Sequence, residues 1–153
     1  MKPVFRCLIG GALVSVLLLC GCAPQKVGQL SVLVLDGWTD APVSEARVVV
    51  AETGEESITN AEGQTKPFTV PILHDQRFSK VLPQQWGAVT VLVYADGYYD
   101  CMMYAVRVNA DTHRAALPVR LFPGDGTMGE TPFLLVESPD SVWASELLRR
   151  FAQ

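Results

Sequence analysis

The amino-acid sequence predicts a mostly β protein: a seven-stranded antiparallel β-sandwich followed by a C-terminal amphipathic helix. Three observations support this prediction. Between Gly28 and Pro123 the apolar residues come in short runs rich in β-branched side chains, and turn residues end each run. Nothing in that stretch repeats its apolar residues with the 3.6-residue period of a helix. Such a period appears only after Pro139.

The seven expected strands are separated by Gly, Asp and Asn, the residues that favour tight turns. Their spacing is typical of an antiparallel sandwich. They cover residues 30–35, 46–51, 57–59, 65–70, 88–94, 99–108 and 116–122.

The last thirty residues have a different pattern. Gly-rich residues 124–129 predict a flexible break, and residues 132–136 are a candidate for one more strand. Ser138 is then expected as a helix N-cap, with Pro139 in the first turn. In the helix that follows, one face is apolar and carries Trp143, Leu147, Leu148 and Phe151.

Two roles are open for this helix. An apolar stripe is usually buried within its own domain, so the helix is expected to cover a sheet face or edge of the sandwich. The alternative is a docking helix that binds a partner's groove or the surface of a bilayer.

Composition and charge exclude several classes of function. The chain has 153 residues, of which 49% are hydrophobic and 18% charged, which is too apolar for a disordered protein. Without residues 1–21 it keeps 10 basic and 16 acidic residues, a net charge of −6. An acidic body has no general attraction for phosphate backbones or anionic lipid, so we expect no nucleic-acid binding.

The first residues have the pattern of a secretory signal peptide. Lys2 and Arg6 form a short basic leader, and an uncharged apolar run follows over residues 7–19. This run is shorter than the roughly 20 residues that span a bilayer as a stable helix. An uncleaved anchor over residues 7–25 is the alternative, with the basic leader on the cytoplasmic side. Either arrangement places the remaining chain outside the cytoplasm.

The apolar run ends in Leu19-Cys20-Gly21-Cys22, which resembles the lipobox of bacterial lipoproteins. The resemblance implies that Cys22 takes a diacylglycerol on its thiol and becomes the new N-terminus. Cys20 departs from the pattern, since Ala, Ser or Thr is commoner at that position. Cys20 is a poorer candidate for the modification because the bulky Leu19 would precede it.

After processing, only Cys22 and Cys101 would remain, and lipid would occupy the first. No intramolecular disulfide is therefore expected, and the core must hold the fold together. Cys101 lies in a strand-like run, so we interpret it as a small buried apolar residue and not as a catalytic thiol.

Four motifs follow one another in the body of the chain: an apolar strand ending at Asp36, a Pro-Val-x-x-Ala-x-Val hairpin at residues 42–48, a Thr-Asn-x-x-Gly turn at residues 59–63, and an Ala-x-Gly-Tyr turn at residues 95–98. With these motifs, residues 28–123 resemble the carboxypeptidase regulatory-like (transthyretin-like) domain. The resemblance implies a transthyretin/Ig-like sandwich. Members of the family are mostly accessory or adhesive modules, so it implies a binding role and no enzymatic activity.

The sequence lacks the marks of the catalytic and crosslinked relatives. Transthyretin-like hydrolases carry a C-terminal Tyr-Arg-Gly-Ser, and residues 149–153 read Arg-Arg-Phe-Ala-Gln. Adhesin repeats with isopeptide crosslinks have a lysine in the first strand, and residues 30–35 contain none. The chain also contains no Gly-x-Ser-x-Gly, no His-Glu-x-x-His and no Gly-rich phosphate loop.

If the strands run strictly up and down, polar residues collect at both ends of the sandwich. One end would hold oxygen ligands suited to calcium, but isolated carboxylates in β-turns are far commoner than ion sites. The other end would hold His74 and His113 near two aspartates, a set that could bind zinc. We expect no metal at either end. The first set is Asp36, Asp40, Asn60, Glu62 and Asp96; the aspartates of the second are Asp75 and Asp111.

Aromatic residues in or beside loops are the remaining candidates for ligand recognition. An exposed aromatic side chain lowers solubility unless it packs or binds. Trp38, Trp86 and Tyr99 are the recognition candidates, with Trp38 first, whereas Tyr98 is expected to pack behind its turn.

These observations predict an extracytoplasmic lipoprotein anchored to a bacterial membrane through Cys22. It would act as a non-enzymatic binding or structural module of the cell envelope, with an envelope protein or a glycan as partner and no cofactor. The alternative is an envelope hydrolase or metal-dependent enzyme that uses the His74/His113 end. The expected organisation is a signal peptide at 1–21, the lipidated cysteine and a tether at 22–28, the sandwich at 29–123, and the linker, candidate strand and helix at 124–153.

Overall fold

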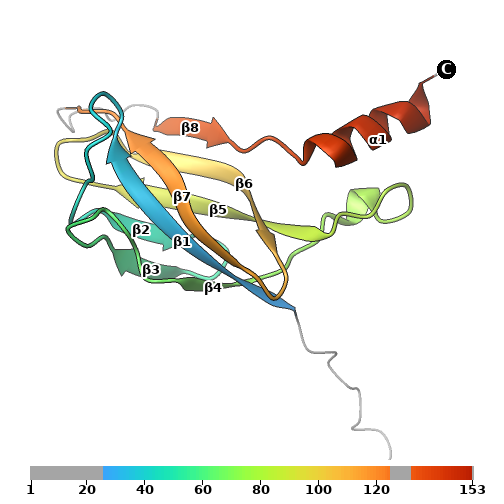
Figure 1. Cartoon of the computed structure of the whole chain (residues 1–153), viewed down its shortest axis with the longest axis horizontal. Helices are drawn as coiled ribbons and strands as arrows, with labels where there is room; N and C mark the ends of the chain where they lie inside the picture. The colour runs from blue at the N-terminus through green and yellow to red at the C-terminus, as the bar shows by residue number, and fades with distance from the viewer. Residues whose placement is uncertain (1–25, 125–131, 153) are drawn as a thin grey trace, which may run out of the picture.

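Two β-sheets pack face to face in the computed structural model, and a helix projects from one end of them (Figure 1). The structure describes residues 26–124 and 132–152. One sheet has three strands in the order β4-β1-β7, and the other has five in the order β3-β2-β5-β6-β8. The strands are β1 (Val27–Asp36), β2 (Arg47–Val50), β3 (Glu55–Ile58), β4 (Phe68–Pro71), β5 (Trp86–Tyr94), β6 (Cys101–Asn109), β7 (His113–Leu121) and β8 (Phe133–Val136).

The core lies between the sheets and is built by alternation along the strands. In β1 every second residue from Gly28 to Asp36 is buried, and in β5 the buried residues are Gly87, Val89, Val91 and Val93. Successive side chains of a strand point to opposite faces, so this alternation directs one apolar row of each strand inward. The β-sandwich prediction is confirmed.

The prediction of seven antiparallel strands is not confirmed. Residues 133–136 add an eighth strand, and two pairs are parallel: β1 with β7 and β6 with β8. Parallel neighbours in one sheet need a connection that returns to the starting end. Between β6 and β8 the chain passes through β7 in the opposite sheet, which provides that return. Up-and-down order along the sequence therefore does not describe the pairing.

The hydroxyls of two buried threonines satisfy backbone amides in the middle of β1 and just before β2. Thr59, only 2% exposed, accepts a hydrogen bond from the Ala46 amide at 2.9 Å and donates one to the Val43 carbonyl at 2.8 Å. The Val32 amide donates to the hydroxyl of buried Thr65 at 3.0 Å. Buried polar groups are costly unless paired, so both threonines stabilise the fold.

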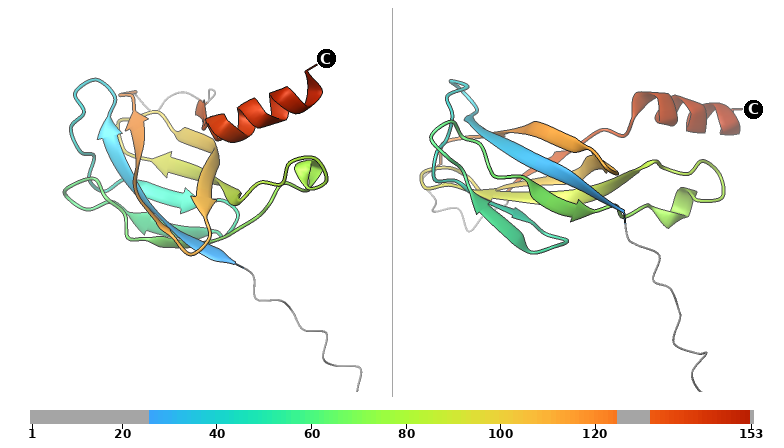
Figure 2. Two further views of the ribbon diagram at one scale, coloured as in Figure 1. Left: turned by 45° about the vertical axis from the view of Figure 1, so that its right-hand side comes forward. Right: turned by 60° about the horizontal axis from the view of Figure 1, so that its bottom comes forward.

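The C-terminal helix α1 (Ser141–Phe151) begins two residues later than the Ser138-Pro139 pattern predicts. Asp140 is the N-cap, and its Oδ1 accepts a hydrogen bond from the Trp143 amide at 3.0 Å. A short 3₁₀ helix, η1 (Gln76–Phe78), lies between β4 and β5, in residues 72–85, which we call the η1 segment. Both views of Figure 2 show α1 and the η1 segment projecting from the same end of the sandwich.

The expectation that α1 covers a sheet face or edge is wrong. It meets the sheet only at the first residue of β5, where Trp143 packs on Trp86, and its hydrogen bonds run to the η1 segment: the Trp143 indole Nε1 donates to the Leu82 carbonyl at 3.0 Å, and Arg150 hydrogen bonds to the Val81 carbonyl. Leu148 and Phe151 remain 75% and 70% exposed. Trp143 and Leu147 of the predicted apolar face are partly buried, so two of its four residues are left exposed.

No helix among residues 26–124 and 132–152 has the length and apolar character needed to cross a membrane.

Candidate functional site

An aromatic cluster joins the C-terminal helix to the start of β5. The Trp143 ring packs edge-to-face on Trp86, with centroids 5.6 Å apart, and on Phe78, with centroids 5.0 Å apart. Aromatic pairs in this geometry contribute about 0.5–1.5 kcal/mol beyond the area they bury. The cluster therefore positions α1 against the η1 segment.

Two adjoining pockets lie on either side of Trp143. The first has a volume of about 430 Å³ and is lined by residues of β5, β6, the η1 segment and the segment that follows β8. The second has about 400 Å³ and lies between α1 and Pro83. Trp86 and Trp143 line both pockets, so together they form one elongated aromatic groove. A groove with aromatic walls and a few charged groups is the usual form of a ligand site.

Charged side chains line the first pocket on two sides. On the η1 side, Asp75 caps η1 by accepting from the Arg77 amide at 3.0 Å, and the Arg77 Nε donates to it at 2.9 Å. The hydrogen bonds from Arg77 hold the pKa of Asp75 below its usual value. On the sheet side, the Arg107 guanidinium lies 5.9 Å from the Trp86 ring centroid.

Glu137 connects the sheet side of the first pocket to the three-stranded sheet. Its Oε2 accepts hydrogen bonds from Arg114 Nη1 of β7 at 2.7 Å and from the Arg107 amide of β6 at 3.0 Å. Burial acts to raise the pKa of Glu137, but the hydrogen bonds and charges of the two arginines outweigh it and lower the pKa below its ordinary value. The carboxylate thus stays ionised and fastens the residues after β8 to the sandwich.

The backbone of β6 is strained beside the pocket. Ala105 lines it and has a φ of 57°, at the point where two residues of β6 oppose one of β5 between Val89 and Val91. An L-residue in this left-handed conformation costs roughly 1–2 kcal/mol. Bulges of this kind redirect side chains near binding sites.

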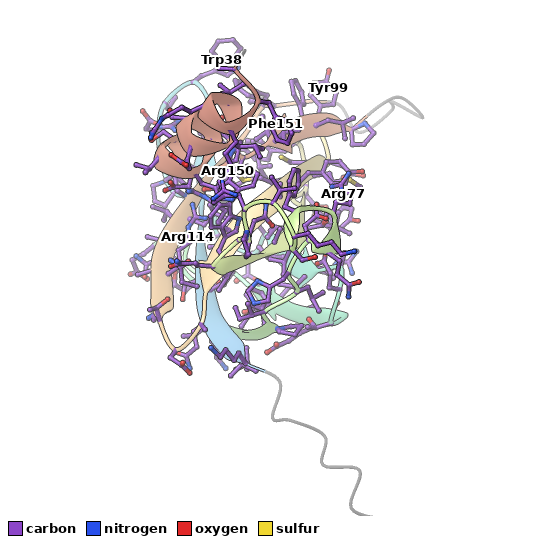
Figure 3. The ribbon with its side chains drawn as sticks, turned by 90° about the vertical axis from the view of Figure 1, so that its right-hand side faces the viewer. Trp38, Arg77, Tyr99, Arg114, Arg150 and Phe151 are labelled. Atoms are coloured by element: carbon purple, nitrogen blue, oxygen red, sulfur yellow. The ribbon has the colours of Figure 1, made fainter. Side chains whose placement is uncertain are left out.

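The other two aromatic candidates lie in a different place. Trp38 contacts Phe122, Phe122 contacts Phe133, and Phe133 contacts Tyr99, with ring centroids 5.2–5.7 Å apart. Trp38 is 77% exposed, and Figure 3 shows it at the top of the molecule, pointing away from the sheets. The structure therefore divides the predicted recognition residues: Trp38 and Tyr99 share one cluster, and Trp86 belongs to the groove.

The expected packing of Tyr98 is found. Its hydroxyl donates to Asp36 Oδ2 at 3.1 Å. Asp36 Oδ1 also accepts from the Thr39 amide and hydroxyl at 2.8 and 2.9 Å, and the Thr39 bonds are the main reason why its pKa is lowered. All these bonds hold the turn after β1, so Asp36 is used structurally.

The two histidines have separate surroundings. His74 lines the first pocket, whereas His113 Nε2 lies 2.8 Å from the Ser31 hydroxyl on the exposed side of β1. Within residues 26–124 and 132–152 no three His, Cys, Asp or Glu side chains gather in a way that could hold a metal ion. Asp40 of the oxygen-rich end forms an ion pair with Arg120 at 2.8 Å.

Of the two cysteine predictions, the structure tests only the one for Cys101. Cys101 is 2% exposed in the core, as expected, and burial raises the pKa of its thiol to about 11. Cys22 lies outside the described residues, so its lipidation stays a prediction.

Sequence reasoning missed Trp143, Phe78 and Arg107 as parts of the groove. Trp143 was assigned to the apolar face of a helix, and Phe78 lies in a segment without a period. No local pattern in the sequence links these three residues to Trp86, because they lie in three separate segments of the chain.

Comparison with known proteins shows no family for this chain. No family model and no curated protein matches the chain. A solved structure that does match is a chain of a type II cohesin–X-dockerin complex from Acetivibrio cellulolyticus, at 19% identity and a TM-score of 0.45. The match covers 69% of this chain and 64% of that one. The two sheets described above therefore define the present protein as a β-sandwich domain, with an aromatic groove beside its C-terminal helix.

Proposed function

We propose that this protein is a lipoprotein anchored through Cys22 to the outer face of a bacterial membrane, where its sandwich is a non-enzymatic module that binds an envelope protein. The anchor is supported by the basic leader, the apolar run and Leu19-Cys20-Gly21-Cys22. The four motifs in residues 28–123 support membership in the carboxypeptidase regulatory-like class. Two of their turn glycines, Gly63 and Gly97, have φ values of 73° and 79°, which glycine adopts most readily.

The observation that carries the binding role is the groove on both sides of Trp143. Its aromatic walls offer apolar contact area, and the polar Nε1 of Trp143 is already bonded to Leu82. The groove also carries charges of both signs, in the ion pairs of Arg77 with Asp75 and of Arg107 with Asp140. Apolar area combined with both charges fits the side chains of a protein better than a neutral glycan.

The enzymatic alternative requires His74 and His113 in one site. His74 lines the first pocket, whereas His113 is not among that pocket's lining residues and lies against Ser31, so no specific observation favours this alternative.

Substitution of the cysteine tests the anchor. Cys22→Ser should accumulate as the unprocessed precursor without an acyl group, because a hydroxyl cannot form the thioether. Cys20→Ser is the matched control and should be processed normally. Intact mass and acyl content of the membrane fraction decide the result; a mature, acylated Cys22→Ser would refute the proposal.

Site-specific photo-crosslinking tests the binding role in cells. A photoreactive residue at Gln84, which lines the first pocket, should give a discrete adduct, and one at Glu56 on β3 should not. Protease treatment should remove the added mass. Adducts that disappear only with a glycan hydrolase would identify a glycan partner, and equal labelling at both positions would exclude the groove as the site.

A further inference from the structure

Within residues 26–124 and 132–152, strand β8 has a backbone partner on one side only and lies at an edge of the five-stranded sheet. It pairs with β6 on one side, where the Phe133 amide donates to the Asp100 carbonyl at 2.8 Å and the Glu137 amide to the Tyr104 carbonyl at 3.0 Å. The N–H and C=O groups of alternate residues point to opposite sides of a strand. Those of Leu134 and Val136 therefore point away from β6, at the free edge of the five-stranded sheet (Figure 1).

This edge lacks the usual protection against pairing. Natural edge strands carry charges, prolines or bulges. The opposite edge of the same sheet, β3, carries Glu55 and Glu56. In contrast, β8 has the sequence Phe-Leu-Leu-Val, and the side chains of Leu134 and Val136 are 54% and 71% exposed.

We propose that β8 pairs antiparallel with β8 of a second copy of this chain, around a two-fold axis at Leu135. In this register Leu134 lies opposite the partner's Val136, and each such pair can exchange both of its N–H···O bonds. The two residues with outward backbone groups are thus each other's partners, as a self-complementary interface requires. The two five-stranded sheets become one continuous sheet.

Charge complementarity favours a second copy over an unrelated strand. α1 follows the C-terminal end of β8 (Figures 1 and 2), so in an antiparallel pair it extends past the Phe133 end of the partner's strand. That end is acidic: Asp96 and Asp100 are exposed there, whereas Asp40 is paired with Arg120. The last turn of α1 carries Arg149 and Arg150 against Glu146, a net positive charge.

The exposed apolar residues fit the same arrangement. Four residues of strand bury much less than the roughly 1,200 Å² of a stable interface. α1 is 11 residues long, about 16 Å, and exposes Leu148 and Phe151. Exposed Trp38 belongs to the aromatic cluster that contains Phe133. Contact between these two surfaces supplies the area that strand pairing lacks.

Disulfide crosslinking of the full chain in cells tests this proposal. Leu135→Cys places two thiols on the two-fold axis, at a non-hydrogen-bonded position where strands approach closest. Mild oxidation should yield a covalent dimer at least several-fold more abundant than from Leu134→Cys in the same strand. Ala115→Cys, exposed on β7 in the other sheet, is the second control, and the unsubstituted chain gives the background from the native cysteines.

A second substitution separates pairing from misfolding. Leu134→Lys adds a charge at the free edge without removing a bond to β6, so the monomer should remain protease-resistant. In the Leu135→Cys background it should reduce the dimer several-fold, and Arg149→Glu with Arg150→Glu should also reduce it. A protease-resistant Leu135→Cys chain that stays monomeric, dimerises no more than Ala115→Cys, or crosslinks to another protein would overturn the proposal.

Discussion

Arg114 Nη1 of β7 donates a hydrogen bond to Glu137 Oε2 at 2.7 Å, and this bond ties the C-terminal segment to the three-stranded sheet. The same guanidinium nitrogen donates to the Arg107 carbonyl of β6 at 2.9 Å. The two sheets and the segment after β8 thus meet at one ion-paired seam. Glu137 has a side chain only 13% exposed, so the seam is shielded from water and its strength depends on the carboxylate remaining charged.

We expect Glu137→Gln to lower the free energy of unfolding by about 2 kcal/mol at pH 7, the usual value of a charged hydrogen bond. Because the folded-state pKa of Glu137 is below its ordinary value of 4.5, its stabilisation is present above that pH and is lost as the pH falls. Urea unfolding of both proteins between pH 3 and about pH 7 checks this. The difference should be largest above about pH 5 and shrink in acid. The exposed Glu56→Gln is the matched control and should change the free energy of unfolding by less than about 0.5 kcal/mol at pH 7.

Replacing the strained Ala105 should stabilise the protein. Glycine adopts a φ of 57° without strain, which offsets its entropic cost, so Ala105→Gly should raise the free energy of unfolding by up to about 1 kcal/mol. Ala88→Gly, on the neighbouring strand β5 with ordinary φ, is the matched control and should lower it by about 0.5–1 kcal/mol. Chemical denaturation measures both. A loss of stability at both positions would contradict the strain argument.

We expect Trp143 to hold α1 against the η1 segment and the start of β5. Trp143→Ala removes the ring contacts with Phe78 and Trp86 and the bond to the Leu82 carbonyl. Amide hydrogen exchange should become faster throughout α1 and η1, whereas the exchange of the core strands β1 and β5 should hardly change. Phe151→Ala, at a position 70% exposed, should leave both regions as they are. Unchanged protection of α1 in Trp143→Ala would show that another contact holds the helix.

Cys101 should be chemically inert in the folded protein. Its side chain is buried, and its pKa is raised to about 11, so little thiolate exists at neutral pH. Peptide mapping after treatment with iodoacetamide should find Cys101 unmodified until denaturant unfolds the chain. The exposed position in Ala115→Cys should react at once. Rapid labelling of native Cys101 would contradict its placement in the core.

Local pattern determined the element types of this protein. Residues 30–35 and 88–94 were identified as strands because alternation with β-branched residues is a property of a short segment alone, and both lie within β1 and β5. The same holds for α1, whose apolar face follows from the spacing of its apolar residues. The sequence predicts Ser138 as its N-cap, whereas the structure has Asp140, because the side chain of either residue can accept the hydrogen bond of the first helical amides.

Only the tertiary structure decided which elements meet. The parallel pairing of β1 with β7, the position of Glu137 between two arginines, and the contact of Trp143 with Trp86 all join segments far apart in the chain. The sequence marked Trp86 as an exposed aromatic but carried no sign of its partner. Local preference ends within a few residues, whereas these contacts depend on which strand edges and apolar faces remain free after the sheets have formed.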